Sequence, residues 1–288
     1  MAQTYTDWSM VVVDDGSTDD TAARVARIGD QRIALVRQGN RGVSAARNRG
    51  IEASAGDAAL FLDADDVLAP DAMARLASGL AADPGAVAAY GPYARFPARG
   101  RRVHGTVPLG RALLPALLIG NRFANGGHLL IRRTALNAAG RFREALQFGE
   151  DWEYWVRLAL CGRFIRAPGH RPTLYVRDRA GSAYRATAHV TSGYTACLDA
   201  VFSLAALRDH FSVDELAQFR SRAEAERDWI AGRELLRLRR FHEGLALLNQ
   251  SVAAAPSPKR RALRAFAHIL PWVPAGWRGP FHPHPRPG

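Results

Sequence analysis

The chain has 288 residues, of which 48% are hydrophobic and 23% are charged. These proportions are ordinary for a soluble globular protein and exclude a wholly disordered chain, a collagen-like repeat and a disulfide scaffold. The 39 basic and 27 acidic residues give a formal net charge of +12. This excess favours phosphorylated ligands, nucleic acid or anionic lipid, although an arginine-rich composition explains part of it equally well.

The sequence contains no run of 18 apolar residues and no secretory signal, so it predicts neither a membrane-spanning helix nor export. The two cysteines, Cys161 and Cys197, are too few for a disulfide framework and fit a reducing compartment. We therefore expect a cytoplasmic location.

Strands and helices alternate through the first third of the chain. Short apolar strands are expected at 8–13, 33–36 and 58–62, each followed by a helix, and these helices end near residues 27, 53 and 80. This order predicts the α/β class, a mixed sheet flanked by helices. Further on, the pattern indicates strands at 87–90 and 129–132 and helices at 109–119 and from residue 150, where apolar side chains recur at helical spacing.

After about residue 190 the composition changes to helices rich in Ala, Leu, Arg and Glu. We expect residues 233–248 to form one arm of a helical hairpin. Prolines and basic residues then accumulate, and the last stretch is expected to be a loose tail. The predicted organisation is an α/β domain at 1–190, a helical region at 191–270 and a tail at 271–288.

Acidic side chains follow two of the predicted strands. Asp14 and Asp15 come at the end of the first, and the third ends in Asp63, Asp65 and Asp66. In an open α/β sheet, ligands bind beyond the carboxyl ends of the strands. The first pair has the chemistry to hold a base edge or a ribose, but Asp-Asp-Gly-Ser is also an ordinary turn and helix cap. The three carboxylates of the second group repel one another unless a cation lies among them. This favours a Mg²⁺ or Mn²⁺ site over the alternative, an acidic turn exposed to solvent.

Two further groups are candidates for the same site. Glu150 and Asp151 begin a helix whose dipole keeps a carboxylate ionised, so they are either a helix cap or a general base. Arg41, Arg47 and Arg49 have the chemistry to pair with a diphosphate, or lie on a solvated basic face. A Gly-rich Lys-Ser/Thr phosphate loop and a G-x-G-x-x-G fingerprint are both missing, which argues against P-loop hydrolases and dehydrogenases.

Taken together and in order, these segments resemble glycosyltransferase family 2, the inverting nucleotide-sugar transferases of the GT-A fold. The matching text covers roughly residues 3–185 and consists of residues 3–8, 11–21, 42–51, 61–66, 130–133, 140–142 and 149–153. The helical C-terminal region lies outside the resemblance.

The resemblance implies a role for each candidate. Asp15, with Asp14 beside it, matches the aspartate that meets the nucleobase, and Arg47 lies where a basic residue approaches the nucleotide. Asp63 and Asp65 match the Asp-x-Asp motif that holds ribose and a divalent metal, Mn²⁺ or Mg²⁺, with Asp66 as an alternative ligand. Asp151, with Glu150 beside it, matches the catalytic base.

The sequence departs from the family in two places. Family members begin with an apolar strand and a helix before the text that here starts at Gln3, about 20 to 30 residues by ordinary element lengths. Their apparent lack indicates a misassigned start, a fragment or a degenerate copy. Arg179 also stands where many relatives carry a histidine that joins the metal site, and arginine cannot ligate a metal.

The resemblance therefore implies a transferase that moves a sugar from a UDP- or dTDP-sugar to a saccharide or lipid-linked acceptor, in cell-envelope polysaccharide synthesis. The alternative is a non-catalytic nucleotide-sugar binder or assembly partner. The basic C-terminal region has the charge to rest on the inner face of an anionic membrane, or is simply solvated. Nucleic-acid binding rests on net charge alone and is not expected.

Overall fold

The computed structural model describes residues 2–97, 103–104, 112–178 and 191–269. The chain divides into two compact units: Met1–Leu117 with Asn121–Ala180, and Leu118–Gly120 with Gly181–Gly288. The tail expected at 271–288 and Arg179 lie outside the described residues. Within the described residues, no helix is long and apolar enough to cross a membrane.

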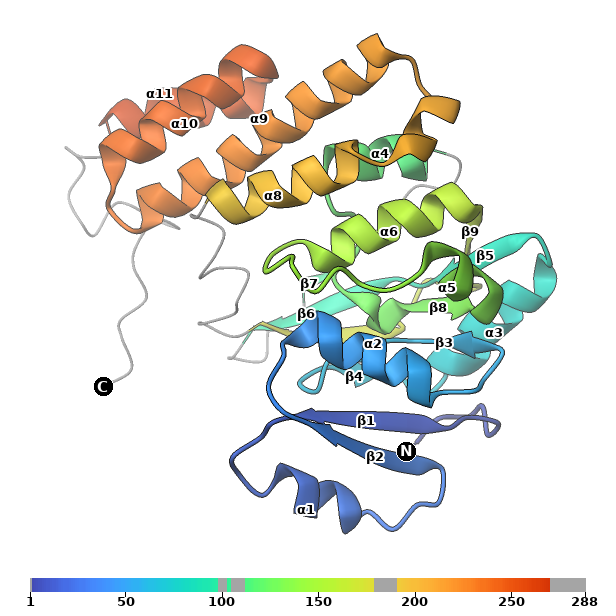
Figure 1. The fold of residues 1–288 in the computed structure, drawn as a ribbon. Coiled ribbons are helices and arrows are strands. Elements are labelled where there is room, and N and C mark those ends of the chain that lie inside the picture. Colours follow the sequence, from blue (N-terminus) through green and yellow to red (C-terminus); the bar gives the residue numbers. More distant parts are fainter. Residues whose placement is uncertain (1, 98–102, 105–111, 179–190, 270–288) are drawn as a thin grey trace. The chain divides into compact units, whose positions relative to one another are not determined.

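The first unit is a mixed α/β structure (Figure 1). Its strands are β1 (Met10–Asp15), β2 (Ile33–Gln38), β3 (Ala58–Ala59), β4 (Val67–Leu68), β5 (Ala86–Tyr90), β6 (Tyr93–Pro97), β7 (Val103–His104), β8 (Leu129–Arg132), β9 (Arg163–Arg166) and β10 (Leu174–Asp178). Its helices are α1 (Thr21–Ala26), α2 (Val43–Ala53), α3 (Ala72–Ala82), α4 (Leu113–Ile119), which continues into the second unit, η1 (Gly126–His128), α5 (Arg133–Ala139) and α6 (Glu150–Cys161).

The strands form three sheets. β1 and β2 pair in parallel, a second sheet has the order β3-β8-β5-β9, and a third has the order β4-β10-β6-β7. Both four-stranded sheets mix parallel and antiparallel pairs. Helix α3 packs on the β3-β8-β5-β9 sheet through Leu76 and Leu80, which meet Ala89 and Ala167 in the core. The predicted α/β class with a mixed sheet and flanking helices is therefore confirmed.

β1 and β2 have only each other as sheet partners among the described strands. Helix α2 contacts β1, and in Figure 1 α1 lies on the opposite side of this strand pair. Val11, Val12 and Val13 make β1 strongly apolar, yet each is only half-buried. The strand expected over 58–62 is likewise paired only at Ala58–Ala59, because β8 alone pairs with it within the described part of the chain.

The second unit is helical, as expected for the C-terminal region. It contains α8 (Thr191–Phe202), η2 (Ala205–Asp209), α9 (Val213–Arg237), α10 (Phe241–Ala254) and α11 (Pro258–Ile269). A capping box, in which Ser212 and Glu215 exchange side-chain to backbone hydrogen bonds, starts α9. Trp229, Leu236, Leu248 and Ala267 form the shared core of α9, α10 and α11.

The expectation of a single helical arm over 233–248 is wrong. Helix α9 ends at Arg237, Arg239 adopts a positive φ of 63°, and α10 begins at Phe241. The hairpin turn thus falls inside the predicted arm. The turn carries Leu238, Arg239 and Arg240, which are good helix formers, so propensity gave no sign of it.

Candidate active site

The turn after β1 is fixed by Asp14. Its buried carboxylate accepts hydrogen bonds from the Ser17 backbone N–H at 2.8 Å and from Arg37 Nε at 3.1 Å. The bonds from Ser17 and then the Arg37 charge lower the pKa of Asp14. Asp14 is therefore an ionised residue that holds the turn together.

Asp15 holds the loop that leads into α2. Its carboxylate accepts hydrogen bonds from Gln38 Nε2 at 2.8 Å and from the backbone N–H groups of Arg41 at 2.9 Å and Gly42 at 2.8 Å. Burial alone raises the pKa of Asp15, but these three bonds outweigh it and the pKa is lowered. Gly16 has a φ of 83°, and a Cβ there would lie 2.7 Å from Asn40 N, so the approach of this loop requires glycine.

Arg47 joins two of the predicted acidic groups. From α2 its Nη2 donates to Asp63 Oδ1 at 3.1 Å and its Nη1 donates to Glu150 Oε1 at 2.9 Å. Its guanidinium also lies over the ring of Phe142, 5.5 Å from the centroid. Only 12% of the Arg47 side chain is exposed. The structure thus brings the Asp-x-Asp turn and the start of α6 to one buried cation.

The turn at 63–66 is held from its other side by Asn125. Asn125 Nδ2 donates to Asp63 Oδ2 at 3.1 Å and to Asp66 Oδ2 at 2.5 Å. The second oxygen of Asp66 accepts the Arg177 backbone N–H at 2.8 Å. Burial outweighs these bonds and raises the pKa of Asp66. Both oxygens of Asp66 are therefore occupied by amide donors.

The carboxylates of the turn at 63–66 fit a divalent cation only if substrate supplies some of its ligands. Among the described residues, no three His, Cys, Asp or Glu side chains converge on a point that would hold a metal. Asp63 and Asp65 nevertheless lie on one short turn and offer hard oxygen ligands. Mg²⁺ is commonly bound by one or two carboxylates together with substrate phosphates. The turn suits a cation of that kind rather than one held by protein alone.

Glu150 and Asp151 begin α6 directly after Gly149, whose φ is 72°. Asp151 Oδ1 accepts the Trp152 backbone N–H at 2.6 Å, and Asp151 Oδ2 accepts from Asn121 Nδ2 at 3.2 Å. Asp151 as a whole is half-buried. Burial, and then the charge of Glu150, raise the pKa of Asp151 to about 7, against the opposing charge of Arg47. A carboxyl group with that pKa is suited to take a proton at neutral pH.

Residues 1–140 match the family model described as Glycosyl transferase family 2. This part of the chain belongs to glycosyltransferase family 2. The predicted resemblance is thereby confirmed.

Several relatives of this chain have named roles. The succinoglycan biosynthesis proteins ExoO and ExoU of Rhizobium meliloti are each 33% identical to it, over 174 and 199 residues. These matches cover 56% and 60% of this chain, and the chain spans only 50% and 56% of those two proteins. A shorter match, 37% identical over 68 residues, is to Escherichia coli WfgD, named as a UDP-Glc:alpha-D-GlcNAc-diphosphoundecaprenol beta-1,3-glucosyltransferase, and it covers 23% of this chain and 27% of WfgD.

Solved structures with the same fold include Staphylococcus aureus TarS 1-349. Its complex with UDP-GlcNAc has a TM-score of 0.62 and 15% identity to this chain, and the likeness covers 94% of this chain and 81% of that one. The complex with UDP has a TM-score of 0.59 at 16% identity, covering 94% and 80% of the two chains. At this level of identity the likeness confirms the GT-A fold and nothing finer.

Three asparagines for which the sequence predicted no role hold the site together. Asn125 and Asn121 contact the predicted carboxylates, and Asn48 ties α2 to the loop before α6 by exchanging hydrogen bonds with the Phe142 backbone at 3.0 and 2.8 Å. Because asparagine is uncharged, a charge pattern in the sequence does not reveal such residues. The signal available for Asn125 was its place before Gly126 and Gly127, since Asn-Gly marks a turn.

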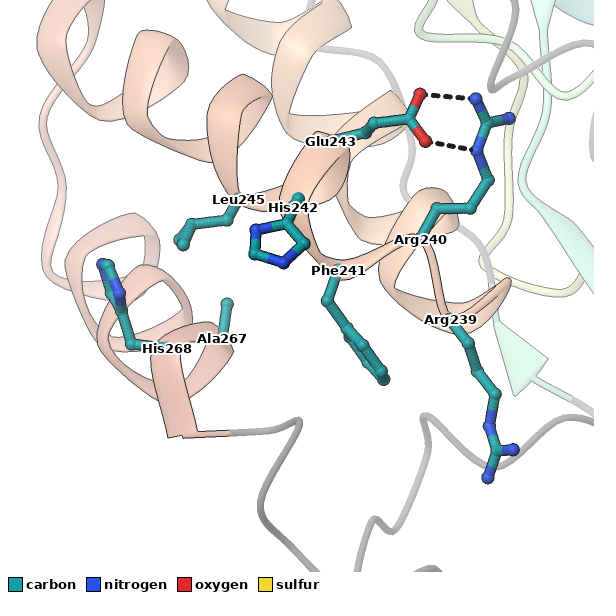
Figure 2. A pocket seen from close by; sticks show the side chains of 8 residues that line it. All are labelled: Arg239, Arg240, Phe241, His242, Glu243, Leu245, Ala267 and His268. Atoms are coloured by element: carbon teal, nitrogen blue, oxygen red, sulfur yellow. Dashed lines mark hydrogen bonds and ion pairs between the residues drawn. The ribbon is translucent and has the colours of Figure 1, made fainter.

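A cavity of about 410 Å³ lies in the helical unit, where Arg239, Arg240, Phe241, His242, Glu243, Leu245, Ala267 and His268 line it (Figure 2). Arg240 and Glu243 pair across two hydrogen bonds in it. None of the predicted site residues lines this cavity. Two of those residues, Asp63 and Glu150, contact Arg47 instead.

Proposed function

We propose that this chain transfers a sugar from a nucleotide-sugar donor to a saccharide or lipid-linked acceptor, with inversion, in the synthesis of a cell-envelope polysaccharide. The observation that carries the proposal is that a cationic group and a carboxyl group of raised pKa lie side by side. A buried arginine faces the Asp-x-Asp turn, and a carboxyl group with a pKa of about 7 lies beside it. The arginine has the charge to stabilise a departing nucleoside diphosphate. The carboxyl group has the pKa to take a proton from an acceptor hydroxyl.

The proposed step is a single displacement. Asp151 takes the proton of the acceptor hydroxyl as that oxygen forms a bond to the anomeric carbon. The bond from this carbon to the diphosphate oxygen breaks, and the nucleoside diphosphate leaves with the electron pair. Arg47 pairs with the diphosphate oxygens, and Asp15 and Asp63 hold the base and ribose. A divalent cation held by Asp65 and Asp63 would supply further neutralisation of the leaving group.

UDP is the proposed nucleotide, because TarS was solved with UDP and UDP-GlcNAc and the name of WfgD specifies a UDP-sugar. WfgD also acts, by its name, on a saccharide joined to diphosphoundecaprenol. An acceptor of that lipid-linked kind is proposed here. The two succinoglycan proteins support an exported polysaccharide as the product class.

A thermal-shift panel tests the donor site. UDP, dTDP and GDP are each added with and without Mn²⁺ to the wild-type chain, to Asp65→Asn and to Asp57→Asn. Asp57 is an exposed aspartate outside the site and serves as the matched control. Ligand at 100 times its Kd stabilises the folded state by about 2.7 kcal/mol, which raises Tm by roughly 5 °C or more. We expect such a shift with UDP and Mn²⁺ in the wild type and in Asp57→Asn, and its loss in Asp65→Asn.

The transfer step needs a separate assay, the release of UDP from UDP-glucose or UDP-GlcNAc in the presence of lipid-linked saccharide. Asp151→Asn should lower this rate about 10²-fold or more, the usual contribution of a general base. UDP binding without any release, together with an Asp151→Asn variant that behaves like wild type, would instead support a non-catalytic nucleotide-sugar binder. The absence of a shift with every nucleotide would overturn the proposal as a whole.

A further inference from the structure

Asn125 is the one amide side chain in the described part of the chain that contacts two carboxylates of the Asp-x-Asp turn. Its Nδ2 donates one hydrogen to Asp63 Oδ2 at 3.1 Å and the other to Asp66 Oδ2 at 2.5 Å. Both donor hydrogens are therefore used on carboxylate oxygens. Two negative groups that would otherwise repel one another are held in one geometry by a shared neutral donor.

Asn125 is itself held from within its own loop. It is 6% exposed, and its Oδ1 accepts the Gly127 backbone N–H at 2.8 Å, which caps the short helix η1. The next two residues have no room for a side chain. A Cβ on Gly126 would lie 2.7 Å from Phe61 Cβ, and one on Gly127 would lie 2.9 Å from Leu174 Cδ1. The loop is thus wedged between the end of β3 and strand β10.

His128 fixes the far end of this loop. Its Nδ1 lies 2.8 Å from Gly91 O, and its Nε2 accepts the Ala124 backbone N–H at 3.3 Å. The ring is fully buried between Tyr93 and Phe123. Every polar atom of the ring has a protein partner, so His128 acts as a rigid support of the loop.

Strand β10 completes the arrangement. Asp66 accepts the Arg177 backbone N–H at 2.8 Å, so this carboxylate is held between β10 and Asn125. Asp63 is held between Arg47 and Asn125. The turn that carries Asp65 is therefore clamped at both of its flanking carboxylates.

We propose that Asn125 is a positioning residue for the donor site, which sets the orientation of Asp63 and Asp66 and through them the placement of Asp65 toward a cation and diphosphate. This inference rests on the proposed function for its ligand, UDP with Mn²⁺. Asn125 does not contact the reacting atoms. It acts through the two carboxylates it holds.

The binding test uses the full chain and UDP titrated with and without Mn²⁺. The variants are Asn125→Ala, Asn125→Asp and the matched control Asn137→Ala, an exposed asparagine of α5. Asn125→Ala and Asn125→Asp should each weaken UDP binding with Mn²⁺ at least tenfold, and weaken it less than threefold without Mn²⁺. Asn137→Ala should stay within twofold of wild type in both conditions. Loss of both affinities to the same degree would mean a merely structural role and would overturn the inference.

A stability test separates this inference from the donor proposal. Asn125→Asp places a third carboxylate against Asp63 and Asp66, so its Tm should fall by about 3 °C or more. Adding Asp66→Asn exchanges donor and acceptor in the hydrogen bond between positions 125 and 66. The double variant should therefore regain at least half of the Tm that Asn125→Asp loses. Its UDP affinity should stay low, because Asp63 still lacks its amide donor.

The outcomes are distinct. If wild-type chain binds no nucleotide, the proposed function fails, and the double variant alone decides whether Asn125 holds the carboxylates. If wild type binds UDP and both Asn125 variants bind it equally well, the donor site stands and the positioning role is refuted. A double variant no more stable than Asn125→Asp also refutes it.

Discussion

Arg47 Nη1 lies 2.9 Å from Glu150 Oε1, although the two residues are 103 positions apart in the sequence. The same guanidinium reaches Asp63 at 3.1 Å. One buried cation therefore couples the turn at 63–66 to the start of α6. The donor-binding half and the base-bearing half of the proposed site share this single side chain.

Arg47→Ala should be costly even without ligand. The substitution leaves Asp63, Glu150 and Asp151 close together with no cation between them, and loss of one partner of a buried pair costs about 3 kcal/mol. Urea unfolding at pH 7 measures the loss. Arg49→Ala is the control, because Arg49 makes an exposed pair with Glu52 and its removal should cost about 0.5 kcal/mol or less. An equal loss of unfolding free energy in the two variants would contradict a stabilising role of Arg47 between Asp63 and Glu150.

The pKa of Asp151 is predicted to lie near 7 and to depend on Glu150. Since the charge of Glu150 raises the pKa of Asp151, Glu150→Gln should lower it. Carboxyl carbon shifts of ¹³C-labelled aspartate, followed by NMR from pH 3 to 9, report this titration directly. A wild-type midpoint near 4, or a midpoint that does not move in Glu150→Gln, would be inconsistent with the proposed environment.

The same raised pKa means that Asp151 destabilises the folded state at high pH. Between its unfolded pKa near 3.8 and its folded pKa near 7, the folded chain binds the extra proton, so stability falls as pH rises through this window. Asp151→Asn should remove the penalty. The variant should be about 2 to 4 kcal/mol more stable than wild type at pH 8 and nearly equal to it at pH 4, at about 1.4 kcal/mol per pKa unit. Denaturant unfolding at the two pH values measures the difference, and a constant offset at both would count against the assignment.

Two glycine substitutions should have opposite effects on stability. A Cβ on Gly232 would lie 2.9 Å from the Gly244 backbone O, where α9 and α10 cross, whereas a Cβ on Gly50 in α2 would lie 3.7 Å from Val13 Cγ2. Replacing a helical glycine by alanine normally stabilises by up to about 1 kcal/mol. Gly50→Ala should follow this rule, and Gly232→Ala should lose about 1 to 3 kcal/mol to the clash. Thermal unfolding of the two variants compares them, and a stabilised Gly232→Ala would show that the helices can move apart.

Much of the fold follows from local patterns. Helices α2, α3 and α6 and strands β5 and β8 lie within a few residues of their predicted bounds, because apolar periodicity and Gly or Pro punctuation define them. The limits at 58–62 and 233–248 were missed for different reasons. Pairing partners decide where a strand extends, and a tight turn such as that at Arg239 depends on packing rather than on propensity.

The charged residues of the site could be predicted from the sequence, but the contacts between them could not. Spacing and chain order pointed to Asp63, Glu150 and Arg47 separately, but a sequence pattern does not say that one guanidinium spans the other two. The contacts of Asn125 and Asn121 depend on loops brought together by the sheet order. Neutral donors at such places become visible only when the carboxylates around them are located.

The half-buried valines of β1 have a practical consequence for handling the protein. Among the described strands, β1 pairs only with β2, so its other edge presents a row of unpaired backbone groups beside apolar side chains. Such an edge is a template for another strand, and it carries no lysine or proline to discourage pairing. As the concentration rises, molecules should associate edge to edge through residues 10–13, and light scattering would record the growth in mass. A charged substitution at Val12 should keep the preparation dispersed.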